Sequence, residues 1–159
     1  MKTVRVSASG HVGAAASQVY AVIADYRRHH PHIVPPQYFE GVDVLEGGVG
    51  AGTRTRVRMQ VLGKKRAFEQ VVTEPEPGRV LMETNTDGSA VTTFTVEPTG
   101  ENASHVTIAT DIPLQPGLQG VLERLALRLL FPGIYDKEIA RLAEYVDGLQ
   151  TGRNTVNSR

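Results

Sequence analysis

Residues 117–150 read GLQGVLERLALRLLFPGIYDKEIARLAEYVDGLQ, and this stretch has the apolar spacing of one long helix. Its repeating apolar positions are Leu118, Leu122, Leu125 and Leu129, followed by Tyr135, Ile139, Leu142, Val146 and Leu149. A helix of about 30 residues is about 45 to 50 Å long, which exceeds the length of a typical strand. We therefore expect a single rod that crosses a whole sheet.

Two features interrupt this helix pattern. Pro132 removes one backbone hydrogen bond, at a cost of about 3 kcal/mol in an isolated helix, so it predicts a kink. We expect this kink to hold space open between helix and sheet. Glu123, Arg124 and Arg128 break the leucine-rich part, so the stretch is too short and too charged for a membrane span.

The chain before this helix reads as strands and short helices. Residues 3–12 alternate polar and apolar side chains, as a half-buried strand does. Residues 14–25 have a helical apolar face, with Ser17 as a candidate N-cap. Three prolines limit residues 26–36 to a short second helix and a turn, because proline disfavours helix in the residue before it.

Six further strands are predicted between the short helices and the long one. Each pair is separated by a turn rich in Gly, Pro, Asn or Asp, and such short links join antiparallel neighbours. The strand candidates are residues 37–46, 53–62, 67–73, 79–85, 89–97 and 105–112. One meandering sheet is the simplest arrangement.

Composition narrows the class of protein. The 159 residues are enough for one domain with its own core, and the absence of cysteine excludes disulfides and thiol chemistry. Seventeen Lys and Arg residues balance seventeen Asp and Glu residues, whereas a nucleic-acid-binding protein usually has a basic excess. Residues 1–12 lack the pattern of a signal peptide. We expect a cytoplasmic protein without a nucleic-acid partner.

Several short motifs carry a resemblance to a known family. They are AASQVY at 15–20 leading into ADY at 24–26, GAGTR at 50–54 and FTVEP at 94–98. With the order of elements, they make the chain similar, over about residues 3–149, to the START-related helix-grip superfamily (SRPBCC), in particular its bacterial polyketide cyclase/dehydrase and lipid-transport group.

The resemblance implies an α+β helix-grip fold. In this fold a seven-stranded antiparallel sheet wraps around a long C-terminal helix, two short helices follow the first strand, and an apolar cavity lies between sheet and helix. We expect this domain to span residues 1–149, with residues 150–159 as a polar, disordered tail. The family's roles range from lipid or quinone carriage to cyclisation of polyketides, and no catalytic residue is carried over from it.

Strand alternation predicts which side chains face the helix. In the strand at 53–62, the set that contains Thr55, Val57 and Met59 points one way, while Arg54, Arg56 and Arg58 point the other way. The ligand-binding residues expected from this alternation and from the helix pattern are Thr55, Val57, Met59, Phe68, Gln70, Met82, Thr84, Thr92, Phe94, Ile108, Thr110, Leu122, Leu125, Phe131 and Tyr135. An apolar wall with a few hydroxyl groups suits a mostly hydrophobic ligand. Ordinary core packing is the alternative.

Two other patterns have simple structural explanations. The arginine stripe can pair with Glu69, Glu83 and Glu97 as a ladder on the outer face of the sheet. The glycine-rich residues 47–52 join two strands, so they predict a flexible hairpin, with a lid beside the cavity as an option, rather than a dinucleotide loop.

The histidines at 29, 30 and 32 lack the spacing of a metal site, so we expect no metal and no cofactor. We expect them in a polar loop at the mouth of the cavity, where one could donate a proton to a ligand. No serine is placed as a nucleophile, so the catalytic residues are unknown. The polar candidates for acid-base chemistry are Tyr26, His29, Tyr38, Asp111 and Tyr135.

Two functions follow from this pattern. The first is binding or transport of a hydrophobic small molecule such as a lipid, a quinone or a polyketide-like aromatic. The alternative is a cyclase or aromatase that uses the same cavity. The predicted strands place no ionisable side chain inward, which favours binding, because a cyclase needs an acid or base beside the reacting atom. A monomer and a homodimer are both compatible with the sequence.

Overall fold

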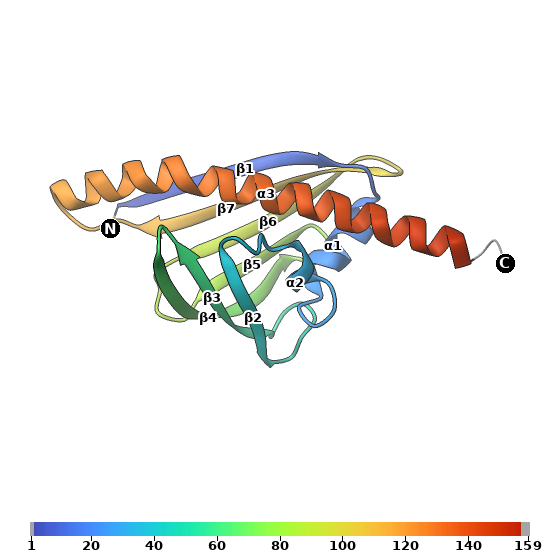
Figure 1. Cartoon of the computed structure of the whole chain (residues 1–159), viewed down its shortest axis with the longest axis horizontal. Helices are drawn as coiled ribbons and strands as arrows, with labels where there is room; N and C mark the ends of the chain where they lie inside the picture. The colour runs from blue at the N-terminus through green and yellow to red at the C-terminus, as the bar shows by residue number, and fades with distance from the viewer. Residues whose placement is uncertain (1, 157–159) are drawn as a thin grey trace.

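The structure, a computed structural model, describes residues 2–156. One long helix lies against a single sheet, and two short helices follow the first strand (Figure 1). The elements are β1 (Thr3–Val12), α1 (Ala16–Ala24), α2 (His30–Ile33), β2 (Phe39–Glu46), β3 (Arg54–Val61), β4 (Lys64–Glu76), β5 (Val80–Asn85), β6 (Val91–Gly100), β7 (Ala103–Pro113) and α3 (Leu118–Val156). The predicted α+β helix-grip fold is confirmed.

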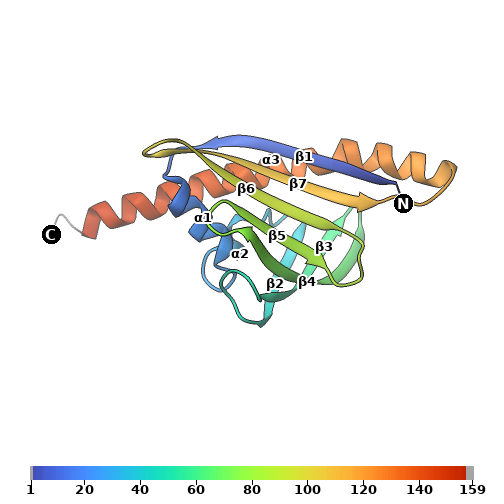
Figure 2. The same cartoon turned by 180° about the vertical axis from the view of Figure 1, so that it is seen from behind.

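The seven strands form one antiparallel sheet in the order β1-β7-β6-β5-β4-β3-β2. Strands β2 to β7 form the predicted meander, and β1 adds to the edge of β7. In both views α3 runs lengthwise beside β1 and β7, and its last turns extend past α1 (Figures 1 and 2). The sheet therefore has two edge strands: β1, which lies beside α3, and β2 at the opposite edge.

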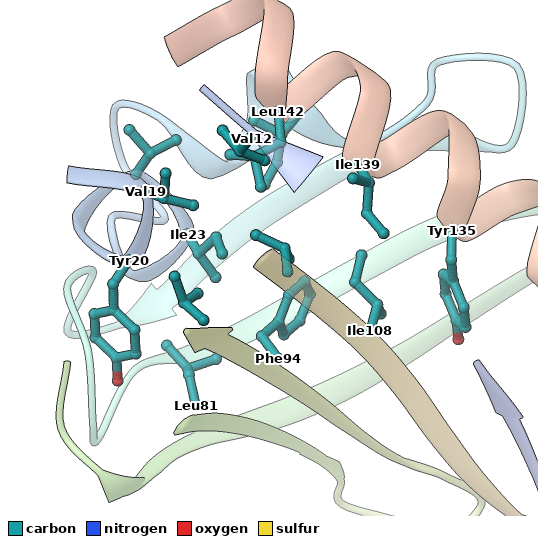
Figure 3. Close-up of a cluster of buried hydrophobic side chains, with 14 of the residues drawn as sticks. Val12, Val19, Tyr20, Ile23, Leu81, Phe94, Ile108, Tyr135, Ile139 and Leu142 are labelled. Atoms are coloured by element: carbon teal, nitrogen blue, oxygen red, sulfur yellow. The ribbon is translucent and has the colours of Figure 1, made fainter. Parts of the chain in front are cut away.

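The hydrophobic core lies between α1, the second half of α3 and the middle of the sheet. Figure 3 shows Ile23, Phe94, Ile108 and Leu142 converging from four elements, and all four are buried. Burial of one such side chain contributes about 1.5–3 kcal/mol. This core fixes α3 on the sheet along only part of its length.

Helix α1 begins and ends differently from the sequence prediction. Its N-cap is Ala15, without a side-chain hydrogen bond, so Ser17 lies inside the helix and the predicted cap is wrong. At its end, the Gly50 amide donates to the Ala24 carbonyl at 2.9 Å, and the Tyr26 amide donates to the Gly48 carbonyl at 2.8 Å. The glycine-rich loop is thus tied to α1, and it lies outside the lining of the pocket described below, so the lid interpretation is wrong.

Helix α3 is longer than predicted and continues through Pro132. Residues 150–156, expected as a disordered tail, belong to this helix, and residues 157–159 of that expected tail lie outside the described residues. Within residues 2–156, no helix combines the length and the apolar character needed to cross a membrane.

Candidate functional site

A pocket of about 400 Å³ lies between α3 and strands β2 to β7. Most of its lining is apolar: Val34, Phe39, Val42, Val57, Met59, Val61, Leu62, Phe68, Ala90, Phe94, Ile112, Ala126, Leu127, Leu130, Phe131 and Ile134. Its polar lining consists of His30, Lys64, Arg66, Gln70, Glu83, Asn85, Ser89, Thr92, Thr110, Glu123, Tyr135 and Glu138. Small-molecule sites in proteins have this size and combine an apolar lining with polar groups that orient the ligand.

The pocket has two chemically different ends. We call the buried part of the lining with His30, Gln70, Glu83 and Glu138 the inner end. We call the part with the exposed residues Leu62, Lys64, Arg66 and Ala126 the mouth. The mouth lies between the β3–β4 hairpin and the first half of α3.

Most of the predicted ligand-binding residues lie on this lining. They are Val57, Met59, Phe68, Gln70, Thr92, Phe94, Thr110, Phe131 and Tyr135. Thr55 and Ile108 are buried but lie outside the lining, and Ile108 belongs to the hydrophobic core. Alternation along β3, β4, β6 and β7 therefore placed the correct side chains inward.

The predicted orientation of β5 is wrong. Met82 and Thr84 lie outside the lining, and the buried side chains are Leu81, Glu83 and Asn85. Glu83 pairs directly with Thr92 of β6, and residues directly opposite each other in a sheet share a face. Residues 80, 81 and 82 of β5 are all apolar, so alternation does not decide whether residues 80 and 82 or residue 81 face inward. The charge of Glu83 favoured an outward position for residues 81 and 83 in the prediction.

The predicted orientation of the first half of α3 is also wrong. Leu122 and Leu125 are exposed and lie outside the lining. Glu123, Leu127 and Phe131 face the pocket instead. This half of α3 is apolar on two faces, so spacing alone does not show which face is buried. Because Glu123 lies on the pocket-facing side, the prediction took that side as the polar one.

Glu83 is the centre of the inner end. The hydroxyl group of Tyr26 donates to Glu83 Oε1 at 2.6 Å, and Gln70 Nε2 lies 3.5 Å from Glu83 Oε2. His30 Nε2 lies 3.7 Å from Glu83 Oε1, and the His30 ring stacks on Tyr26. Burial, and then the negative charge of Glu83, raises the pKa of the Tyr26 hydroxyl well above its usual value. Tyr26 is thus a neutral donor that holds the carboxylate in place.

Glu138 is the second acid of the inner end. Its residue is 3% exposed, and its carboxyl group has no hydrogen-bond partner within the described part of the chain. Burial, and to a smaller extent the charge of Glu83, raises the pKa of Glu138 to about 8. At neutral pH this group is therefore mostly a carboxylic acid, whose O–H can donate into the pocket.

A chain of hydroxyl groups runs along one wall. Thr92 Oγ1 and Thr110 Oγ1 are 2.8 Å apart, and Thr110 also contacts the hydroxyl group of Tyr135. Burial raises the pKa of Tyr135 above its usual value, so its hydroxyl group stays protonated. These groups can exchange hydrogen bonds with a ligand, since each can act as donor or acceptor.

The three neighbouring histidines point in different directions. His30 is buried at the inner end of the pocket, so its predicted place at the mouth is wrong. His29 Nδ1 lies 2.8 Å from the Tyr145 hydroxyl, and His32 stacks on the Tyr145 ring. Among the residues that the structure describes, no group of three or more His, Cys, Asp or Glu side chains is arranged to hold a metal ion.

The outer face of the sheet carries part of the predicted charge ladder. Glu69 accepts from Arg56 at 2.7 Å and from Arg54 at 3.2 Å, while Arg58 pairs with Asp43. Glu97 pairs with Arg79 instead of the arginine stripe. Glu83 is buried on the other face of the sheet, so it is not part of the ladder. The arginine stripe is therefore neutralised on the surface.

The other polar candidates lie elsewhere. Asp111 forms an ion pair with Arg5 at 2.6 Å, and Lys137 donates to the Tyr38 hydroxyl at 3.1 Å. Neither Asp111 nor Tyr38 lies on the lining of the pocket. Sequence reasoning missed Glu83 and Glu138, although Glu138 interrupts the apolar face of α3 between Ile134 and Leu142.

The long helix, the seven-stranded sheet and the pocket between them define the helix-grip class of α+β proteins. The chain belongs to the polyketide cyclase / dehydrase and lipid transport family, which it matches over residues 3–147. The predicted family is thus confirmed. No curated protein matches the sequence.

Solved structures share the fold. The KanY protein is 28% identical, with a TM-score of 0.76 over 92% of this chain and 99% of that one. The Zhui aromatase/cyclase from Streptomyces sp. R1128 is 17% identical, with a TM-score of 0.77 over 92% of this chain and 94% of that one. A START superfamily protein from Mycobacterium smegmatis is 16% identical, with a TM-score of 0.70 over 91% of this chain and 98% of that one.

Proposed function

We propose that this protein binds a largely apolar small molecule in the pocket between α3 and the sheet. The observation that carries the proposal is the lining, which is mostly apolar and has buried polar groups at the inner end and along one wall. Such a site buries the body of a ligand and orients it by a few hydrogen bonds. Lipids, quinones and polyketide-like aromatics have this character.

The family and its relatives support this class of ligand. The family description combines polyketide cyclisation with lipid transport, and both involve largely apolar molecules. Balanced charge argues against a nucleic-acid partner, and we propose a cytoplasmic monomer or homodimer.

A second candidate function is general acid-base catalysis on the bound molecule. Glu83 and Glu138 share the inner end, and burial keeps Glu138 protonated while Glu83 accepts from Tyr26. A buried acid that stays protonated beside a second acid is an arrangement that acid-base enzymes use. The Zhui relative is named as an aromatase/cyclase, so ring closure of a polyketide-like chain is the reaction to test.

The binding proposal can be tested with N-phenyl-1-naphthylamine, an uncharged apolar fluorescent dye. We expect saturable binding to the wild-type protein. Leu127→Trp places a larger ring on the lining and should weaken dye binding at least about fivefold, since overpacking a filled site costs about 1–3 kcal/mol. Leu125→Trp is the matched control, because Leu125 lies two residues away but is exposed. Equal dye binding by both variants would remove the pocket as the site.

The catalytic proposal needs a different measurement. Wild-type protein is incubated with a synthetic poly-β-ketone thioester, and aromatic products are followed by absorbance. We expect faster product formation than in buffer, and a loss of at least about 100-fold in Glu83→Gln, which keeps the shape but cannot accept a proton. A wild-type rate equal to the buffer rate, together with normal dye binding, would leave binding as the function.

A further inference from the structure

The inner end of the pocket carries more acid than its neighbours neutralise. Glu83 and Glu138 both lie there, and Glu123 lines the pocket farther along α3 with a buried Oε2 atom that has no hydrogen-bond partner in the described structure. The basic side chains on the lining, Lys64 and Arg66, are exposed at the mouth. The bases therefore lie at the mouth, whereas two of the three acids, Glu83 and Glu138, lie at the inner end.

The polar atoms at the inner end are mainly acceptors. His30 Nδ1 lies 2.7 Å from the Ile23 carbonyl, which can only accept, so the ring proton of a neutral His30 is on Nδ1 and Nε2 carries a lone pair. Glu83 Oε2 has only the 3.5 Å contact with Gln70. Glu138 has no hydrogen-bond partner in residues 2–156, and its protonated carboxyl group offers one acceptor oxygen before a ligand binds and two once it ionises. These acceptors line the pocket, so a ligand that supplies donors can form hydrogen bonds with them there.

We propose that the ligand of this pocket is an apolar molecule whose buried end is a protonated amine. An ammonium group supplies three donors and one positive charge, which match the acceptors and the acid of the inner end. The remaining apolar body fits the lining between Phe94, Leu127 and Phe131. This inference rests on the proposed binding function and names its ligand class.

Protonation of Glu138 gives the proposal a second observable. The titratable groups that face Glu138 are Glu83 from β5, His30 from α2, Tyr26 after α1 and Tyr135 on α3 itself. None of these supplies a permanent positive charge, and burial raises the pKa of Glu138 to about 8. An ammonium group beside Glu138 lowers that pKa, because an opposite charge favours the ionised acid. Binding at pH 7 therefore releases about one proton to the buffer.

The test compares two ligands of the same shape, 2-(2-naphthyl)ethylamine and 2-(2-naphthyl)ethanol, by titration calorimetry at pH 7. We expect the amine to bind at least about tenfold more tightly, since hydrogen bonds to charged groups are the strong ones. The heat of amine binding should differ between phosphate and Tris buffers by the heat of about one buffer proton, and the heat of alcohol binding should not.

Two variants locate the effect. Glu138→Gln keeps the shape of the side chain but cannot ionise, so the preference for the amine should fall to within about threefold and proton release should disappear. Glu144→Gln is the matched control, because Glu144 lies on the same helix but is exposed. It should behave like the wild-type protein.

The outcomes separate this inference from the proposed function. Equal or tighter binding of the alcohol by the wild-type protein, or an amine preference that survives in Glu138→Gln, overturns the amine inference and leaves an apolar pocket. Failure of both ligands to bind the wild-type protein overturns the pocket as a hydrophobic ligand site, and the amine inference with it.

Discussion

The two halves of α3 have the same apolar spacing but different surroundings. In residues 118–133 the side chains of Leu118, Val121, Leu122, Leu125 and Leu129 are 58–76% exposed. In residues 134–149 the side chains of Ile134, Tyr135, Ile139, Leu142 and Val146 are buried. The first half covers a pocket and the second half fills the core. Apolar spacing thus specifies a helix, but it does not specify what lies beneath the helix.

These leucines of the first half stay exposed after all packing within residues 2–156. A row of exposed leucines on one helix face is uncommon on a monomeric protein. The opposite face of the same half supplies Leu127, Leu130 and Phe131 to the pocket. The first half is therefore apolar on both sides, whereas the second half has one apolar and one polar side.

The largest effect is expected in the second half of α3. Leu142→Ala removes a fully buried side chain and should lower the free energy of unfolding by about 2–5 kcal/mol. Leu129→Ala removes the same atoms from an exposed position and should change it by less than about 0.5 kcal/mol. Denaturant unfolding of both variants measures the difference. Similar losses would show that the first half also packs against something.

The next effect concerns Glu138, which lies in the second half but faces the pocket. Its pKa is raised in the folded protein, so folding favours the protonated form, and stability is highest below the unfolded pKa. We expect the free energy of unfolding to fall as the pH rises from about 4.5 to about 8, by about 3 kcal/mol at pH 7. Glu138→Gln should lack this fall and be the more stable protein at pH 8. Parallel pH curves for the two proteins would mean that the acid is not buried without a partner.

A smaller effect is expected at Pro132, which lies where the two halves meet. Pro132→Ala restores a backbone hydrogen bond, so the variant should be as stable as the wild-type protein or more stable. If the proline holds the first half away from the sheet, binding of N-phenyl-1-naphthylamine should weaken about threefold or more. A loss of stability with unchanged dye affinity would make Pro132 a packing residue only.

The smallest effect is expected on the outer face of the first half. Leu125→Ser should leave both the free energy of unfolding and dye affinity within about 0.5 kcal/mol of wild type, because the side chain is exposed and points away from the lining. The two measurements are urea unfolding and dye titration. A large loss of stability would indicate that this face is covered in solution.

The sequence was sufficient for the fold because turn residues divide the strands clearly and period-two alternation survives in most of them. Alternation placed Val57, Gln70 and Phe94 inward correctly. It failed in β5, where three successive apolar residues are compatible with either side chain orientation. The pairing of β5 with β6 determines which orientation is formed. Tertiary pairing of this kind is not visible in a local pattern.

The acids of the inner end were missed for a related reason. A charged residue is normally assigned to the surface, because burial of an unpaired charge is costly. Glu83 is buried with Tyr26 as its donor, and Glu138 is buried largely in its protonated form, and neither circumstance can be read from neighbouring residues. An acidic residue on the apolar face of a strand or helix should therefore also be considered as a candidate site residue.

The pairing of β1 with β7 has a consequence for how the chain folds. Thr3 lies opposite Pro113, so β1 can pair only after β2 to β7 have been synthesised. Strands β2 to β7 join neighbours along the chain and close short loops, which form faster than contacts between distant residues. We therefore expect the meander to assemble first, with β1 docking late and α3 closing over it. In a nascent chain that stops before residue 103, β1 has no partner strand and presents an unpaired edge.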